Sequence, residues 1–393
     1  GYAVKVFEKL PVEGGMLFAG IPPYRLPKEV LKREIDAVKG AGIEIETGVE
    51  MDKEKFEQIR SEYDAIFIAV GAHVSRKLGV EGEDLDGVVH GIDFLRDFNL
   101  GNNHKKTEKI GKKVVVVGGG NVAIDVARCA IRLGSDVTIV YRRSREEMPA
   151  REDEIKEAEE EGVKFMFLAN PTRVLGTEKV EKMELIQMEL GPPDESGRRR
   201  PVPVEGSEFL IDVDTVIPAI GQASDLRFLE GSGVETLRGL AIKADEFGIT
   251  TEEGIFAGGD CVRGAAFAVD AIADGNEAAE SIERFLRGVD LKEGRTSLKI
   301  PAELHEEMEY IKEELEDEEE RGIISKKRRK EPARIGIEAR LKSFEEINIV
   351  FSEDAAVDET GRCFKCRSCL LTFPTVTVET EEEREEILID ADD

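Results

Sequence analysis

The stretch that decides the fold is Lys112-Lys-Val-Val-Val-Val-Gly-Gly-Gly-Asn-Val-Ala-Ile-Asp-Val-Ala-Arg-Cys-Ala-Ile-Arg-Leu-Gly134. Four consecutive valines predict a buried strand, and an amphipathic helix follows the glycines directly. The spacing Gly118-x-Gly120-x-x-Ala123 is the fingerprint of a dinucleotide-binding turn. Gly118 makes the tight turn, Gly120 lets the backbone approach a pyrophosphate, and Ala123 lets the helix pack on the strand. We therefore expect a dinucleotide at this loop.

The residues around this loop also indicate which nucleotide binds. The helix starting at Asn121 and Val122 would face the phosphates with free N–H groups. The next strand ends about 20 residues further on, where an NAD site places Asp or Glu for the ribose. This chain has Arg142 and Arg143 there, and guanidinium groups suit a 2′-phosphate. The pattern favours NADP over NAD, and surface arginines paired with nearby glutamates are the alternative.

The alternation of strand and helix continues through about residue 290. Helical stretches at 28–39, 122–133 and 152–161 lie between apolar runs, which predicts an α/β fold with covered parallel sheets. Around 179–189 the pattern changes to an antiparallel excursion. The predicted strands are 3–7, 43–47, 65–70, 114–117, 137–140, 163–167, 215–220 and 255–257.

The charge balance argues against nucleic acid and anionic membranes as main partners. The 393 residues include 55 Lys and Arg against 84 Asp and Glu, a net charge of −29, and such a chain is repelled by phosphate-rich surfaces. Two acidic runs, 303–320 and 379–393, hold most of the excess. No apolar run approaches the roughly 20 residues that cross a bilayer. We expect a soluble cytoplasmic protein without membrane insertion.

Five ordered blocks resemble the flavin-dependent pyridine-nucleotide oxidoreductases. They are most similar to the small subunit of glutamate synthase and its relatives, which include electron-bifurcating transhydrogenases. The blocks cover about residues 1–290 and are Gly14–Leu17, Gly20–Lys28, Gly118–Asp125, Val140–Ala150 and Phe256–Asp260.

The resemblance implies two interleaved Rossmann-like domains, for FAD and NAD(P), with a C-terminal Cys-rich extension. We expect the FAD domain in two parts, at 1–105 and 215–292, around an NAD(P) domain at 106–214. A charged helical linker at 293–340 and a cysteine-cluster module with an acidic tail at 341–393 would follow. The family's first strand, glycine loop and helix, which cradle the FAD pyrophosphate, are not found before Gly1, and we expect a truncated beginning rather than a variant fold.

The resemblance also implies how FAD is held. Glu8 would bind the adenosine ribose, and Asp260 would bind the ribityl chain or the pyrophosphate side. A helix beginning near Ala271 would point its N-terminus at the flavin pyrimidine and stabilise the anionic reduced ring. The remaining implied FAD-side residues are the glycines and wall residues Gly14, Gly15, Met16, Leu17, Gly71, Gly221 and Gly259.

Three cysteines near the C-terminus have the spacing of a metal site. Cys363, Cys366 and Cys369 match the first three ligands of a bacterial ferredoxin run, but the fourth position of that run holds no cysteine. We expect a four-iron cluster with a ligand from elsewhere, and zinc or free thiols are the alternatives. Cys129 and Cys261 are isolated, so thiol–disulfide chemistry is disfavoured.

These features predict an FAD-dependent NAD(P)H oxidoreductase subunit that passes electrons from the nicotinamide, via FAD, to iron–sulfur clusters of a larger redox complex. Hydride transfer between two rings needs no acid–base residue, so no catalytic residue is assigned. The expected partners are iron–sulfur or ferredoxin-like subunits in a hetero-oligomer. Two alternatives stay open: the glutamate synthase small subunit, and a non-catalytic scaffold subunit that has lost its flavin.

Overall fold

The computed structural model describes residues 1–101, 110–193, 197–295 and 330–360. The chain divides into two units, of which the first comprises Gly1–Gly294 and Ile335–Ile347 and the second comprises Arg295–Arg334 and Asn348–Asp393. We define two lobes in the first unit by their residues. The first lobe contains 1–75 and 222–294, and the second lobe contains 91–218.

The second lobe is built on a four-stranded parallel sheet of order β12-β5-β6-β7. All four valines of the fold-deciding strand β5 are buried, because both faces of the sheet are covered. Val114 and Val116 pack against the helical side, and Val115 and Val117 pack against the antiparallel strands. The sheet strands are β5 (Lys113–Val117), β6 (Asp136–Tyr141), β7 (Lys164–Phe167) and β12 (Thr215–Pro218).

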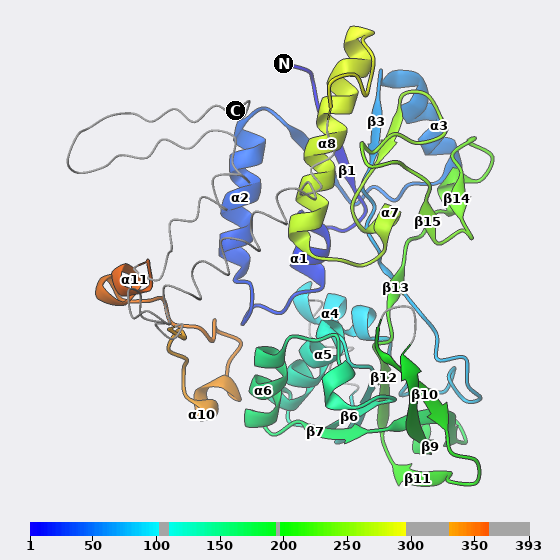
Figure 1. Cartoon of the computed structure of the whole chain (residues 1–393), viewed down its shortest axis with the longest axis vertical. Coiled ribbons are helices and arrows are strands. Elements are labelled where there is room, and N and C mark those ends of the chain that lie inside the picture. Colours follow the sequence, from blue (N-terminus) through cyan, green and yellow to red (C-terminus); the bar gives the residue numbers. More distant parts are fainter. Residues whose placement is uncertain (102–109, 194–196, 296–329, 361–393) are drawn as a thin grey trace, which may run out of the picture. The chain divides into compact units, whose positions relative to one another are not determined.

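Helices cover one face of this sheet and an antiparallel sheet covers the other (Figure 1). The helices are α4 (Gly91–Asn99), α5 (Asn121–Arg132) and α6 (Glu152–Glu160), with a 3₁₀ turn at Arg145–Glu147. The antiparallel strands are β8 (Ala169–Gly176), β9 (Val180–Pro193), β10 (Arg199–Pro203) and β11 (Phe209–Asp212). The predicted α/β alternation and the predicted antiparallel excursion are both confirmed.

The first lobe contains two parallel strand pairs, β1 with β2 and β3 with β16. The strands are β1 (Lys5–Glu8), β2 (Glu44–Thr47), β3 (Ile66–Ile68) and β16 (Ile255–Ala257), and short antiparallel pairs join β4 (Val74–Ser75) to β13 (Gln222–Ala223) and β14 (Thr236–Leu237) to β15 (Ala241–Ile242). The helices are α1 (Gly15–Ala19), α2 (Lys28–Gly40), α3 (Lys53–Glu62), α7 (Asp260–Arg263) and α8 (Ala268–Arg287), with a 3₁₀ turn at Arg227–Leu229. The helix expected near Ala271 thus begins three residues earlier.

A short segment from beyond the two lobes packs back onto them. This return segment, Ile335–Ile347, contains α10 (Ile337–Arg340) and belongs to the first unit. Ile347 is 2% exposed and its N–H donates to the Tyr24 carbonyl at 3.2 Å, while Phe344 lies 4.7 Å from Phe98 between ring centroids. The boundary expected between 340 and 341 falls inside this segment. In the second unit the structure describes α11 (Glu353–Thr360).

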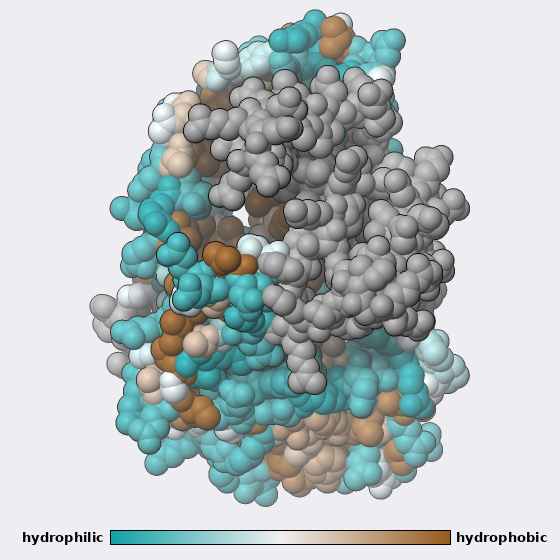
Figure 2. Space-filling model, turned by 60° about the vertical axis from the view of Figure 1, so that its left-hand side comes forward, coloured by the Kyte–Doolittle hydropathy of each residue, from teal (hydrophilic) through white to brown (hydrophobic). Residues whose placement is uncertain are grey.

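One face of the molecule is mainly polar among the residues that the structure describes (Figure 2). Figure 2 shows one face on which hydrophilic atoms predominate among the coloured residues, with apolar atoms in scattered groups. No helix in the described part of the chain is long and apolar enough to cross a membrane.

Candidate functional site

The glycine loop between β5 and α5 has the geometry that its sequence predicts. Gly118 has a φ of 144°, and a Cβ there would lie 2.3 Å from the Ala219 carbonyl oxygen, so only glycine fits this turn. Ala123 is fully buried, and its Cβ would lie 3.5 Å from a Cβ placed on Gly118. At Gly120 a side chain would meet nothing nearer than Pro149 Cγ, at 3.9 Å. The loop is therefore packed at Gly118 and open at Gly120.

The start of α5 is left available for an anion. No side chain caps the helix N-terminus at Gly120, so its first N–H groups and the helix dipole favour negative charge. Asn121 instead accepts a hydrogen bond through Oδ1 from the backbone of Arg151, at 3.3 Å, and the Ala150 N–H donates to the Gly119 carbonyl at 3.1 Å. The block Val140–Ala150 therefore closes over the loop, a role that sequence reasoning did not assign to it.

The two arginines after β6 have different environments. Arg142 is exposed. Arg143 is 5% exposed, and its Nε donates to the carbonyl of Arg199 on β10 at 2.8 Å. The nearby Glu147 accepts from Ser144 instead, in a capping box. Of the two predicted phosphate-binding residues, Arg142 is exposed to solvent, whereas Arg143 is buried and bonded to β10.

Four of the residues expected on the FAD side gather after β1. Gly14 and Gly15 have φ values of 104° and 49°, and a Cβ on Gly15 would lie 3.9 Å from Glu8 Oε2. The Glu8 carboxylate also accepts from the Leu10 N–H at 2.8 Å. Met16 and Leu17 follow Gly15 in the first turn of α1, and both are half-buried.

The strand β16 brings together three more expected residues. Gly259 has a φ of 73°, and a Cβ there would lie 3.4 Å from the Cβ of Ala271 on α8. Asp260 accepts from the Ala266 N–H at 3.1 Å, and desolvation raises the pKa of its carboxyl. Cys261 is fully buried, and its thiol donates to the carbonyls of Ile68 and Gly258, which makes it a packed core residue.

The last two expected glycines lie beside the short pair β4–β13, where the chain leaves and re-enters the first lobe. Gly71 and Gly221 have φ values of 64° and 119°. The Gly71 carbonyl accepts from the Ser224 hydroxyl at 2.7 Å, and the Gly221 carbonyl accepts from the Arg76 N–H at 3.0 Å. Both glycines therefore occupy turns that disfavour other residues.

The predicted cysteine cluster falls outside the described residues, as do both acidic runs. Within the described ranges, no group of three His, Cys, Asp or Glu side chains is arranged to hold a metal ion. The cluster at Cys363, Cys366 and Cys369 stays a prediction from sequence.

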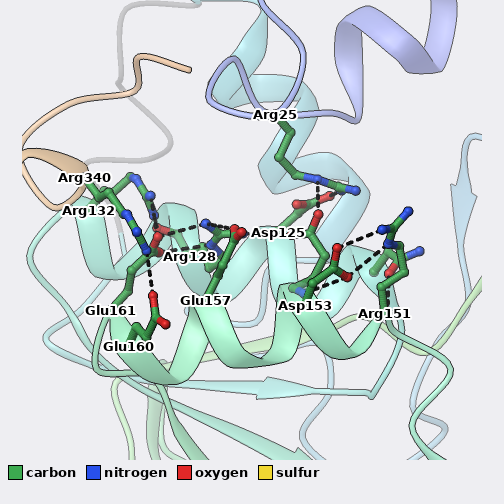
Figure 3. A network of polar contacts seen from close by, with 12 residues as sticks. Arg25, Asp125, Arg128, Arg132, Arg151, Asp153, Glu157, Glu160, Glu161 and Arg340 are labelled. Atoms are coloured by element: carbon green, nitrogen blue, oxygen red, sulfur yellow. Dashed lines mark hydrogen bonds and ion pairs between the residues drawn. The ribbon is translucent and has the colours of Figure 1, made fainter. Parts of the chain in front are cut away.

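A buried ionic network beside the loop is the main feature that sequence reasoning missed (Figure 3). Arg25 Nη1 donates to Asp125 Oδ2 at 2.6 Å, and Arg25 Nε lies 3.0 Å from Glu154 Oε1. Arg128 is fully buried and pairs with Glu154 and Glu161 at 2.8 Å each. The only signal in the sequence was that Arg25 and Asp125 stand in two of the five quoted blocks.

Comparison with known proteins agrees with this geometry. Residues 3–275 match the family described as pyridine nucleotide-disulphide oxidoreductase. The chain is 44% identical over 372 residues to the NADP(+)-dependent formate dehydrogenase subunit beta of Moorella thermoacetica, covering 93% of this chain and 51% of that protein. It is 40% identical over 294 residues to the glutamate synthase [NADPH] small chain of Halomonas elongata, covering 72% of this chain and 62% of that one.

A solved structure shares the fold. Mycobacterium tuberculosis FprA in complex with NADPH superposes with a TM-score of 0.63 over 79% of this chain and 83% of that chain, at 20% identity. This likeness shows the fold alone. The chain spans about half the length of the formate dehydrogenase subunit.

The expected resemblance to the glutamate synthase small subunit is confirmed, and so is the expected α/β fold with Rossmann-like domains. The match covers both lobes, from β1 to the first turns of α8. The chain belongs to the pyridine nucleotide-disulphide oxidoreductase family.

Proposed function

We propose that this chain is the NADPH-oxidising flavoprotein part of a larger redox complex. The observation that carries the proposal is the glycine loop, which is packed at Gly118, open at Gly120 and followed by a helix without a side-chain cap. Such a loop binds a pyrophosphate through backbone N–H groups. The relative from Moorella thermoacetica, a beta subunit named for NADP(+), supports both the nucleotide and the membership of a complex.

The residues of the first lobe fit FAD. The free space at Gly15 faces the Glu8 carboxylate, which can accept hydrogen bonds from both ribose hydroxyls. At the other pair of strands, Gly259 has no side chain against the start of α8, and Asp260 accepts a hydrogen bond from the Ala266 N–H. FAD bound there would accept hydride and release single electrons. The chain's own part is to bind and orient the two cofactors and to keep water away from them.

NADP is preferred over NAD in this proposal because of Arg142. Its guanidinium is exposed at the end of β6, where a dinucleotide fold presents the adenosine ribose. Arg143 supports the site indirectly, because it fastens β10 beside that strand end through the Arg199 carbonyl. In this proposal Arg142 donates to the 2′-phosphate, and Arg143 holds β10 beside it.

The electrons leave through an iron–sulfur cluster in this proposal. Cys363, Cys366 and Cys369 supply three ligands at ferredoxin spacing, and a partner subunit or another segment supplies the fourth. The expected partners are iron–sulfur or ferredoxin-like proteins, which would accept the single electrons that such a cluster releases.

The glutamate synthase small chain is the second candidate, because the relative from Halomonas elongata carries that name. The purified complex decides between the readings. Flavin absorption together with NADPH-driven reduction of an artificial dye is the expected result. Conversion of glutamine and 2-oxoglutarate with a large amidotransferase subunit would establish the second candidate, and absence of flavin would leave the scaffold reading.

A further inference from the structure

The segment Gly20–Lys28 links the flavin-facing helix α1 to the nucleotide-binding helix α5. We call it the clamp segment. At its first-lobe end, Lys28 Nζ donates to the Phe18 carbonyl at 2.7 Å and to the Ile21 carbonyl at 2.6 Å, and Asn99 Nδ2 donates to the Ala19 carbonyl at 2.8 Å. These bonds satisfy the carbonyls that the end of a helix leaves free. The end of α1 is therefore tied to the clamp segment through Lys28 and to α4 of the second lobe through Asn99.

Tyr24 carries the clamp segment into the second lobe. It is 2% exposed and belongs to the hydrophobic core around α5. The guanidinium carbons of Arg132 and Arg128 lie 4.2 Å and 4.8 Å from its ring centroid, within the range of cation–π attraction. The return segment also contacts Tyr24, because the Ile347 N–H donates to the Tyr24 carbonyl.

Arg25, the next residue, makes the ionic contact to α5. Asp125 lies one turn after the start of α5, and its side chain is 5% exposed. Its Oδ2 accepts from Arg25, while its Oδ1 has no partner among the described residues. A buried carboxyl oxygen that loses its hydrogen-bond partner is costly, so this contact favours one relative position of α5 and the clamp segment.

The same face of α5 carries further ion pairs, which join it to α6. Arg128 Nη2 pairs with Glu157 at 2.8 Å, and Arg132 Nη1 pairs with Glu161 at 2.6 Å. Arg340 of the return segment pairs with Glu160 at 2.8 Å (Figure 3). The Arg25–Asp125 pair is the ionic contact that fixes α5 against the clamp segment, beside the hydrogen bond from Asn99 of α4 to the end of α1.

We propose that Arg25 and Asp125 are positioning residues for hydride transfer: their ion pair fixes the nucleotide-binding helix against the flavin-facing helix and so sets the approach of the two rings. The inference rests on the proposed function. Neither residue needs to touch a cofactor, because both act through the helices that carry the binding loops. Small errors in such an approach are costly to the rate.

The first test measures flavin reduction in the whole FAD-loaded protein by stopped flow. Arg25→Gln is expected to lower the limiting rate at saturating NADPH by about tenfold or more, while the dissociation constant of 2′,5′-ADP changes by less than about twofold, since the loop itself is intact. Arg25→Lys should recover part of the rate, because it keeps the charge but not the two-pronged contact. Arg227→Gln, which removes an exposed arginine paired with Asp225, is the matched control.

An unchanged limiting rate in Arg25→Gln would overturn the proposal. So would a loss of rate matched by an equal loss of 2′,5′-ADP affinity, which would mean a merely structural role. If Arg25→Gln does not fold, Asp125→Asn, which keeps the shape of the carboxyl, is judged by the same two measurements.

A second test does not depend on hydride transfer. Binding of 2′,5′-ADP should slow hydrogen exchange in residues 15–28 of the unmodified protein and leave it unchanged in Arg25→Gln. If the unmodified protein shows this effect but NADPH does not reduce its flavin, the proposed function fails and the clamp stands. If 2′,5′-ADP binds without any effect on residues 15–28, the clamp fails regardless of activity.

Discussion

At the residue scale, we expect Arg142, directly after β6, to decide the choice of nucleotide. Replacing Arg142 with Gln should raise the KM for NADPH much more than that for NADH, because one charge-assisted contact contributes about 1.5–3 kcal/mol. Arg143→Gln should instead lower stability, since it frees β10 from the end of β6. Steady-state kinetics with both nucleotides and thermal unfolding separate the two effects. Equal kinetic effects of the two substitutions, or a wild-type preference for NADH, would contradict the assignment.

Asp125 gives the protein a pH-dependent stability. Desolvation raises the pKa of its carboxyl to about 7, against the opposing effect of Arg25. The folded protein therefore holds this proton more tightly than the unfolded chain does, so the contribution of Asp125 to stability is fully present below its ordinary pKa and declines as the pH rises toward 7. The other groups that face it are Arg25, Arg128, Glu154, Tyr24, Cys129 and Lys28.

We compare the Tm of the unmodified protein with that of Asp125→Asn. The difference, unmodified minus variant, is expected to decrease as the pH is raised from 5 to 8. Scanning calorimetry at several pH values measures it. Asp225→Asn is the control: its partner Arg227 lowers the pKa of Asp225, so removal of that carboxyl should shift Tm equally across this range. A difference for Asp125 that stays constant with pH would show that its carboxyl keeps an ordinary pKa.

At the scale of elements, the sequence predicted those helices, strands and turns that depend on local residue patterns. The valine strand, the glycine turn and the helix after it lie within a residue or two of their expected bounds, because period and turn chemistry act over short distances. The ionic network was not predictable in the same way. Arg25 and Asp125 are 100 residues apart, and Arg143 and Arg199 are 56 apart. Such pairings follow from topology and not from spacing.

The return segment is an element whose contribution can be measured. Ile347 is 2% exposed in the core cluster that contains Tyr24 and α5, so Ile347→Ala should lower the free energy of unfolding by about 2–5 kcal/mol. Val350→Ala, at a side chain that is 88% exposed, should change it by less than about 0.5 kcal/mol. Urea unfolding measures both, and equal effects would mean that the return segment does not stabilise the first unit.

At the scale of the whole molecule, the proposed function places two cofactors in one unit and therefore requires an exit for electrons. The first unit carries the complete nucleotide loop and the residues that fit FAD, whereas the cysteine cluster lies beyond residue 360, outside the described residues. Hydride arrives as an electron pair, and iron–sulfur clusters accept single electrons, so a flavin is needed between a nicotinamide and a cluster.

The last prediction concerns the cysteine cluster, which lies far from the expected FAD-side residues in the sequence. Cys366→Ser should abolish or alter the iron–sulfur EPR signal of the reduced protein, because a thiolate ligand is lost. The flavin spectrum and NADPH-driven flavin reduction should remain, since the FAD-side residues all precede residue 295. Cys129→Ser, at a buried cysteine of α5, is the control that should leave the EPR signal intact. One zinc and no iron in the unmodified protein would instead make the cluster a structural site, and electrons would then have to leave the flavin directly to a partner.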